Sequence, residues 1–419
     1  MILANDAILK GRYSVILWAT LCAAIGGSAI AEEKKQGFFE SGKADVSLRY
    51  RFAYVDQDGL ANSAKASTLQ TMLGYRTGTV GGFSGYFQVR NVTNIGAENY
   101  NNTLNGKTTY PVVADPESTE VDQAYLKYST GKNLSITVGR RKLKWDNQRF
   151  ISALGWRQNN RSFDSVVVEG ANDANTLQAK YAYAWNVNRA FTDRSAVGNF
   201  DSNIHLFNTG YSGFSLGKLS AYAYLVDQND AFALGLATKT FGASFGGKKA
   251  MSDSAKILYF AEYAKQSDYA DNPGDFSETY FRGEAGVSFS SGLTVKAGYE
   301  KLGGNGVSSF KTPLALLHAF NGWVDKFVVT PPNGLTDKHV KASMKFKNQS
   351  GFLKGTTLNM AYHDFDSDTG NISYGSEFDI ALIRKFAKRF TVIVKGAFYN
   401  ADQFSTDTKK IWFVLATKF

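Results

Sequence analysis

The chain has a single cysteine in 419 residues, which excludes a disulfide framework and any cysteine-based zinc site. No run of about 18 apolar residues follows Ala31, so the sequence predicts no transmembrane helix there. Aromatic residues nevertheless make up 14% of the chain, a composition too apolar for a disordered protein. The net charge of +10 suits nucleic acid, anionic lipid or an anionic solute, and the placement of the charges has to decide among them.

The N-terminal 31 residues have the build of a cleavable secretory signal. Lys10 and Arg12 precede an apolar run over 13–24, and small residues ending in an A-x-A site lead to Ala31. The run is shorter than the roughly 20 residues that a membrane anchor needs. We expect cleavage after Ala31, which leaves 32–419 as a mature domain without cysteine.

The rest of the chain repeats short segments in which apolar and polar side chains alternate. Residues 293–300 and 340–347 are examples, each with an apolar and a polar face when drawn as a strand. The pattern predicts 18 strands. They start near residues 44, 65, 83, 119, 133, 163, 176, 203, 216, 231, 255, 278, 293, 337, 353, 376, 390 and 409.

The predicted connections alternate in length. Those after even-numbered strands are short, as at 77–78 and 172–173, whereas most of the others are long and rich in Asn, Asp and Gly, as at 97–118 and 303–334. Proline cannot donate to a sheet ladder and should be absent from strands. All six prolines fall in the long connections, at Pro111, Pro116, Pro273, Pro313, Pro331 and Pro332.

An even strand number with short turns on one side and long loops on the other predicts a transmembrane antiparallel β-barrel of the Gram-negative cell outer membrane. The turns and both termini would be periplasmic and the long loops extracellular. A count of 16 strands is the alternative, because 163–185 and 231–250 are the least regular regions. A secreted β-sandwich or lectin would not account for loops on one side only.

The final segment, 411–419, alternates to a terminal Phe419 and resembles the recognition signal of the barrel-assembly machinery. We therefore expect that machinery, outer-membrane lipid and lipopolysaccharide as partners. A closed barrel has no free strand edge, so a monomer is expected, with a trimer as the alternative. Nucleic acid is not an expected partner, because the basic residues alternate along strands and do not cluster on one element.

Two patches of sequence resemble the alginate export family of outer-membrane porins. The first is the Gly-Arg pair at 139–140, the DNQRF segment at 146–150 and the GWRQN-x-R-x-FD segment at 155–164. The second runs over 312–337. Arg141 departs from the resemblance, since Gln would be expected after the Gly-Arg pair. The resemblance implies an 18-stranded barrel with an electropositive lumen, and it does not by itself imply alginate as the solute.

The polar faces of the predicted strands carry many basic residues, and the 138–164 segment has seven Arg and Lys against two Asp. Arg and Lys along a narrow passage favour anions, and the guanidinium fork binds carboxylates in a bidentate manner. The predicted pore-lining, solute-binding residues are Arg49, Arg51, Arg76, Arg90, Lys127, Arg140, Arg149, Arg157 and Arg161, with Asp146 and Asp164 as counter-charges. Further inward residues are Arg282, Lys296, Lys341, Lys345 and Lys395.

These residues predict passive, anion-preferring diffusion of a hydrophilic solute, such as an acidic sugar, an alginate-like oligosaccharide or an organic acid. In the alternative, a general non-selective pore, the basic residues only pair with lumen carboxylates, namely Glu169, Glu262, Glu284, Glu300 and Asp379. A barrel enzyme is the remaining alternative. The chain has no H-E-x-x-H motif, and no enzyme activity and no catalytic residue are predicted.

No cofactor is predicted. The four histidines, His205, His318, His339 and His363, lie on different predicted elements, so we expect structural or lumen-polar roles and no metal site. The acidic segment 364–370 lacks the spacing of an EF-hand, and Ca²⁺ binding at a surface loop there is an alternative. The loop 303–334 is too apolar to extend into water, and we expect it to fold over or into the mouth of the barrel and narrow the pore.

Overall fold

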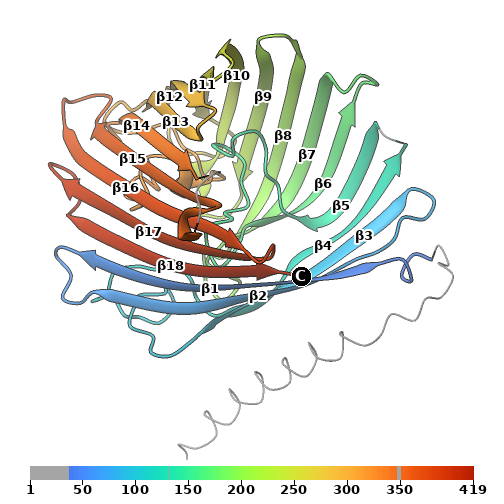
Figure 1. Cartoon of the computed structure of the whole chain (residues 1–419), viewed down its shortest axis with the longest axis horizontal. Helices are drawn as coiled ribbons and strands as arrows, with labels where there is room; N and C mark the ends of the chain where they lie inside the picture. Colours follow the sequence, from blue (N-terminus) through green and yellow to red (C-terminus); the bar gives the residue numbers. More distant parts are fainter. Residues whose placement is uncertain (1–36, 132, 347–350) are drawn as a thin grey trace, which may run out of the picture.

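A computed structural model of the chain describes residues 37–131, 133–346 and 351–419. The expected signal at 1–31 lies outside the described residues. No helix in the described ranges is long and apolar enough to cross a membrane. The described chain forms one closed antiparallel sheet of 18 strands, in which each strand pairs with its neighbours in sequence and β1 also pairs with β18 (Figure 1).

The strands alternate with turns and loops in the predicted order. Their bounds are β1 (Lys43–Gln57), β2 (Ala64–Arg76), β3 (Phe83–Asn94), β4 (Ser118–Thr130), β5 (Leu134–Arg141), β6 (Ser162–Ala171), β7 (Leu177–Asn188), β8 (Asn199–Phe214), β9 (Gly217–Gln228), β10 (Thr238–Ser252), β11 (Ala255–Asp268), β12 (Ser277–Phe289), β13 (Leu293–Leu302), β14 (Leu335–Lys345), β15 (Thr356–Asp366), β16 (Ser373–Phe386), β17 (Phe390–Ala401) and β18 (Thr408–Lys418). The described residues also form three short 3₁₀ helices between strands, η1 (Leu234–Leu236), η2 (Leu317–Ala319) and η3 (Gly351–Leu353).

The 18-strand prediction is confirmed, and the alternative of 16 is wrong. The tenth predicted start is displaced the most, since a strand expected near residue 231 begins at Thr238; the other starts agree within four residues. The apolar residues before it form a loop that contains η1, where Ala233 and Ala237 are buried by tertiary packing. All six prolines lie in the long loops, as predicted.

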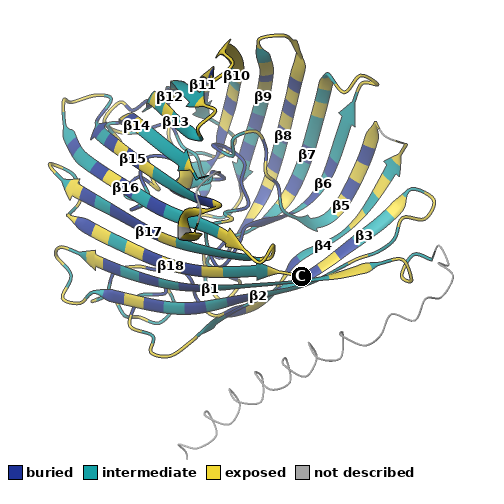
Figure 2. Cartoon of the chain, in the orientation of Figure 1, coloured by how far each residue is buried: buried dark blue, intermediate teal, exposed yellow. Residues whose placement is uncertain are grey.

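Burial alternates along the strands because one face of the wall is directed inward and the other outward. The outward face carries large apolar side chains that are about half exposed, such as Phe241, Tyr263, Val340 and Tyr362. Their inward neighbours are buried, and Figure 2 shows the alternation as stripes along β8 and β18. A band of exposed apolar residues around the whole wall is what a barrel embedded in lipid requires.

The main buried cluster of the molecule lies inside the barrel. The β5–β6 loop (142–161) contributes Trp145 and Phe150, and the β13–β14 loop (303–334) contributes Leu314 and Phe327; all four are buried. Figure 1 shows loop segments running inside the ring of strands. Because the apolar side chains of both loops pack against inward residues of the wall, the prediction that loop 303–334 folds into the barrel is confirmed.

Candidate pore constriction

The β5–β6 loop crosses the lumen from one wall to another. At one end the Asn208 amide on β8 donates to Asp146 at 2.5 Å. At the other end Gln158 donates to the Thr68 hydroxyl on β2 at 2.9 Å, and Arg49 on β1 donates to Gln158 at 2.8 Å. Since β1 and β8 are seven places apart in a ring of 18 strands, the loop bridges the barrel interior.

The β13–β14 loop meets the β5–β6 loop inside the barrel. Arg149 donates to the Asn321 side chain at 2.9 Å, and Arg157 lies 3.7 Å from Asp325. The His318 ring stacks on Trp156 with 4.6 Å between ring centroids and a 5° interplanar angle. These contacts join the two loops into one constriction that reaches the wall from several sides.

The lumen wall is basic on one side and acidic on another. The inward residues of β1 to β5 include Arg49, Arg51, Arg76, Arg90, Lys127 and Arg141. Those of β11 to β16 include Glu262, Glu284, Glu300, Asp337, Glu377 and Asp379. The basic loop residue Arg149 reaches the acidic side, where its Nε lies 2.7 Å from Glu300.

Several of the predicted basic residues have carboxylate partners. Arg51 forms a buried ion pair with Asp115 of the β3–β4 loop (95–117). Arg90 contacts both Glu120 and Asp122 at 2.5 Å. Arg51 and Arg90 are therefore paired with carboxylates, as the alternative of a general non-selective pore requires.

Arg49 and Arg161 differ, since neither has an ion pair among the described residues and their recorded partners are neutral acceptors. Arg49 donates to Gln158 and to the carbonyl oxygens of Gly155 and Arg157. Arg161 donates to the carbonyl oxygen of Pro313 at 2.9 Å. Both guanidinium charges therefore remain uncompensated by an adjacent carboxylate.

A recess of about 250 Å³ opens beside the constriction. Arg157, Arg161 and Arg189 line it together with apolar side chains, among them Trp156, Phe191, Leu316, Leu317 and Val328. Burial lowers the pKa of Arg161 to about 9, with a smaller contribution from Arg189, and burial lowers the pKa of Arg189 to about 10. Both groups are still protonated at pH 7. The recess therefore combines three basic side chains, of which Arg157 lies 3.7 Å from the Asp325 carboxylate, with a largely apolar lining.

A second recess of about 350 Å³ adjoins the first and shares Arg157, Asp325 and Val328 with it. Its lining is more polar and includes Tyr110, Lys326 and Lys410. The two recesses make a continuous basic region where the loops meet.

The structure places most predicted site residues inside the barrel. Arg49, Arg51, Arg76, Arg90 and Lys127 are on the inward face of their strands, and Asp146, Arg149, Arg157 and Arg161 are in the crossing loop.

The prediction is wrong for Arg140 and Asp164. Arg140 shares a strand face with the exposed Ile136 and Val138, and it forms a bidentate ion pair with Asp164 at 2.7 and 2.9 Å on the outward side. The next residue, Arg141, is the one that points inward, 3.5 Å from Glu169. A shift of one residue along a strand moves a side chain to the other face, so adjacent arginines have opposite orientations.

Sequence reasoning missed the surroundings of Lys395. Its ammonium lies 3.5 Å from the ring centroid of Trp323, 4.5 Å from Trp156 and 5.4 Å from Trp412, and 2.7 Å from His318 Nε2. The inward position of Lys395 was predictable from alternation. Its partners were not predictable. Three of the four, Trp156, His318 and Trp323, belong to the two constricting loops and reach Lys395 only when those loops fold into the barrel.

Structural or lumen-polar roles were predicted for the four histidines, and the structure places them on both faces of the wall. His205 lies on the outward face beside Tyr181 and Tyr183, whereas His339 and His363 face inward and adjoin each other. The carboxylates of the acidic segment contact lysines: Asp366 lies 2.9 Å from Lys338 and Asp368 lies 2.7 Å from Lys301.

Comparison with known proteins agrees with this architecture. The pattern described as alginate export matches residues 43–291. No curated protein matches the chain. The described fold resembles solved structures of outer-membrane porins at low identity. Acinetobacter baumannii OccAB4 has 13% identity and a TM-score of 0.70 and covers 90% of this chain and 98% of its own.

Two Pseudomonas aeruginosa structures are similar to the same degree. OccK9 (OpdG) has 11% identity and a TM-score of 0.71, covering 91% of this chain and 99% of its own. OpdK, in a structure with vanillate, has 14% identity and a TM-score of 0.69, covering 91% and 100%. Such identities establish the shared fold, and the match over more than half of the sequence establishes the lineage: the chain belongs to the alginate export family.

Proposed function

We propose that the protein is an outer-membrane channel for passive diffusion of small anionic solutes. Within the expected classes of acidic sugars, oligosaccharides and organic acids, we favour carboxylates with an apolar body. The observation that carries this choice is the recess lined by Arg157, Arg161 and Arg189 and by apolar side chains of both constricting loops. The arginines would hold a carboxylate, and the apolar lining would contact its carbon frame.

The electrostatics of the constriction support an anion preference. Within the described residues Arg49 and Arg161 donate only to neutral oxygens, and Lys326 and Lys410 add positive charge in the adjoining recess. On the opposite wall Glu284 is held by Arg282 at 3.3 Å and by Lys296 at 2.8 Å, and Glu300 is held by Arg149. A low-dielectric passage whose excess charge is positive favours anions through several weak sites.

The vanillate in the OpdK structure is an aromatic carboxylate bound to a protein of the same fold. It belongs to the solute class proposed for this chain, because an aromatic acid combines a carboxylate with an apolar body. A non-selective pore is the second candidate, and the pairing of Arg51 and Arg90 with carboxylates favours it. The proposal includes no catalytic step.

The same proposal includes export by the N-terminal signal, recognition of Phe419 by the assembly machinery, contact with lipid and lipopolysaccharide, and function as a monomer. The sequence pattern and the exposed apolar outer wall support these parts of the proposal.

Reversal potentials in planar bilayers under a potassium chloride gradient test the proposal. We expect the sign that indicates anion preference, and we expect benzoate to reduce the chloride current more than glucuronate at equal concentration. A pore that prefers cations or lacks selectivity would contradict the anion proposal. Equal effects of benzoate and glucuronate would contradict the choice of solutes with an apolar body.

A further inference from the structure

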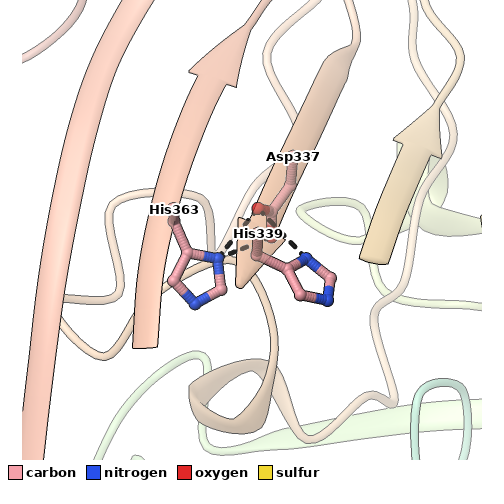
Figure 3. A group of neighbouring side chains, drawn as sticks. All are labelled: Asp337, His339 and His363. Atoms are coloured by element: carbon pink, nitrogen blue, oxygen red, sulfur yellow. Dashed lines mark hydrogen bonds and ion pairs between the residues drawn. The ribbon is translucent and has the colours of Figure 1, made fainter. Parts of the chain in front are cut away.

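Two histidines and an aspartate meet on the inner face of β14 and β15. His339 and His363 are direct cross-strand partners, and Asp337 lies two residues before His339 on the same face. All three side chains are buried, at 0 to 4% exposure. Figure 3 shows both imidazole rings turned toward the Asp337 carboxylate.

The candidate ligand atoms are already close to the spacing of a metal site. Asp337 Oδ1 lies 2.8 Å from His363 Nδ1 and 3.4 Å from His339 Nδ1. One ligand atom from each of the three residues lies within 4.8 Å of the others. An ion with ligands at about 2.0–2.1 Å in tetrahedral geometry separates them by about 3.3 Å, so only small side-chain movements are needed.

The far nitrogens of both rings face further carboxylates. His339 Nε2 lies 3.7 Å from Glu284, and His363 Nε2 lies 3.9 Å from Asp379. When Nδ1 of a histidine binds a metal, its Nε2–H is free to donate to such an oxygen, which fixes the tautomer and strengthens the ligand. Each of the two imidazoles thus stands between the shared Asp337 and its own outer carboxylate.

His339 is also short of partners. Neither of its ring nitrogens makes a hydrogen bond within the described residues, although the residue is only 4% exposed. A buried polar group normally has a hydrogen bond or a bound ion, because leaving it without one costs free energy. Nδ1 of His339 makes no hydrogen bond and lies 3.4 Å from Asp337 Oδ1, so it is the nitrogen that points to a ligand between His339, His363 and Asp337.

We propose that Asp337, His339 and His363 bind one divalent transition-metal ion of the class that prefers imidazole, with Zn²⁺ as the representative. Two nitrogen donors and one carboxylate match this class better than Ca²⁺ or Mg²⁺, which take oxygen ligands. Asn321 of the β13–β14 loop donates to Asp337 Oδ2 at 3.1 Å, so the site lies where that loop meets the wall. The proposal is independent of which solute the channel carries.

Metal binding to the folded full-length barrel, produced without a polyhistidine tag, tests this inference. We expect calorimetry to find one Zn²⁺ per chain and Co²⁺ to give the visible absorption of a tetrahedral site, with Ca²⁺ in excess displacing neither. His339→Gln and His363→Gln should each weaken binding at least about tenfold. His205→Gln, which changes a histidine on the outward face, is the matched control and should bind as the wild type does.

A second pair of variants keeps all three ligands. Glu284→Gln and Asp379→Asn should weaken Zn²⁺ by roughly 10- to 100-fold, because they change only the outer partners of the histidines. Electrophoretic mobility before and after heating verifies that each variant is a folded barrel. The inference is overturned if the folded wild type binds no stoichiometric Zn²⁺, if Co²⁺ gives no tetrahedral spectrum, or if His205→Gln lowers affinity as much as His339→Gln.

Discussion

Arg149 and Glu300 form an ion pair between a loop and the barrel wall, with Nε and Oε1 2.7 Å apart and both side chains 1% exposed. Glu300 also accepts hydrogen bonds from Tyr280 at 2.7 Å and from Asn321 at 2.9 Å. Glu300 therefore contacts both constricting loops at one buried position of the wall.

Replacing Arg149 should loosen the constriction. Arg149→Met leaves the buried Glu300 carboxylate without its cation, which costs about 3–5 kcal/mol in comparable buried pairs. We expect the loop to leave the wall in a fraction of the molecules, giving a higher mean single-channel conductance and noisier current. Glu300→Gln combined with Arg149→Met should recover part of the loss, because no buried charge then remains unpaired.

The matched control is Arg194→Met, which removes an exposed arginine of the β7–β8 loop. It should leave conductance unchanged. If Arg149→Met has the same conductance and noise as Arg194→Met, the ion pair does not hold the constriction.

Arg157 and Arg161 should affect the ion selectivity of the pore, whereas Arg140 should not. Arg157→Gln with Arg161→Gln removes two charges from the recess, so the anion preference measured by reversal potential should fall and benzoate should reduce the current less. Arg140→Gln removes a charge that the structure places on the outward face, paired with Asp164, and should leave selectivity as it is. A loss of selectivity in Arg140→Gln would mean that this part of β5 faces the lumen after all.

The conductance should depend on pH through His318. Burial lowers the pKa of His318 to about 3, against the opposing effect of Asp325, while Lys395 and Arg157 add to the lowering. The pKa of His318 in the packed loop is below its ordinary value of 6.5, so His318 in a detached loop takes up a proton first. The packed loop therefore loses stability as pH falls from about 6.5 toward 3.

We expect wild-type conductance to rise over that range as the loop detaches. In His318→Gln the rise should be smaller, since glutamine can still accept from Lys395 but does not titrate. His205→Gln should keep the wild-type response. An identical pH response in His318→Gln and the wild type would assign the effect to another group.

The barrel was predictable from the sequence because strand alternation, turn residues and proline placement are local signals. The face of the strand on which a side chain lies was harder to predict wherever the strand register is irregular. The bulge between Asp164 and Ser165 is next to Arg140, and there the choice between Arg140 and Arg141 was wrong. A local pattern identifies a strand but not which of two adjacent polar residues faces the lumen.

The constriction was predictable only in outline. The apolar character of 303–334 indicated that the loop packs inward, but not that Asn321 would join Arg149 and Glu300. The pairing of His339 with His363 was unpredictable for the same reason. It depends on the register between β14 and β15, and the two residues are 24 positions apart in the sequence. Such contacts are set by the closed sheet as a whole.

The last prediction concerns loop 303–334 itself. Deleting 308–332 removes Leu314, Phe320 and Val324 from the barrel interior, and removes Asn321, which contacts Arg149. Single-channel conductance should rise at least roughly twofold, since the wall strands remain and only the obstruction is lost.

The matched control deletes 270–275, a loop between β11 and β12 whose residues are exposed or half-buried. Both variants should still show the electrophoretic shift of a folded barrel on heating, because neither removes part of a strand. The control should conduct as the wild type does, because its loop does not enter the constriction. Equal conductance in the folded 308–332 deletion and the wild type would contradict an obstructing role, and the crossing loop 142–161, fixed at Asp146 and Gln158, would then be sufficient to set the pore size.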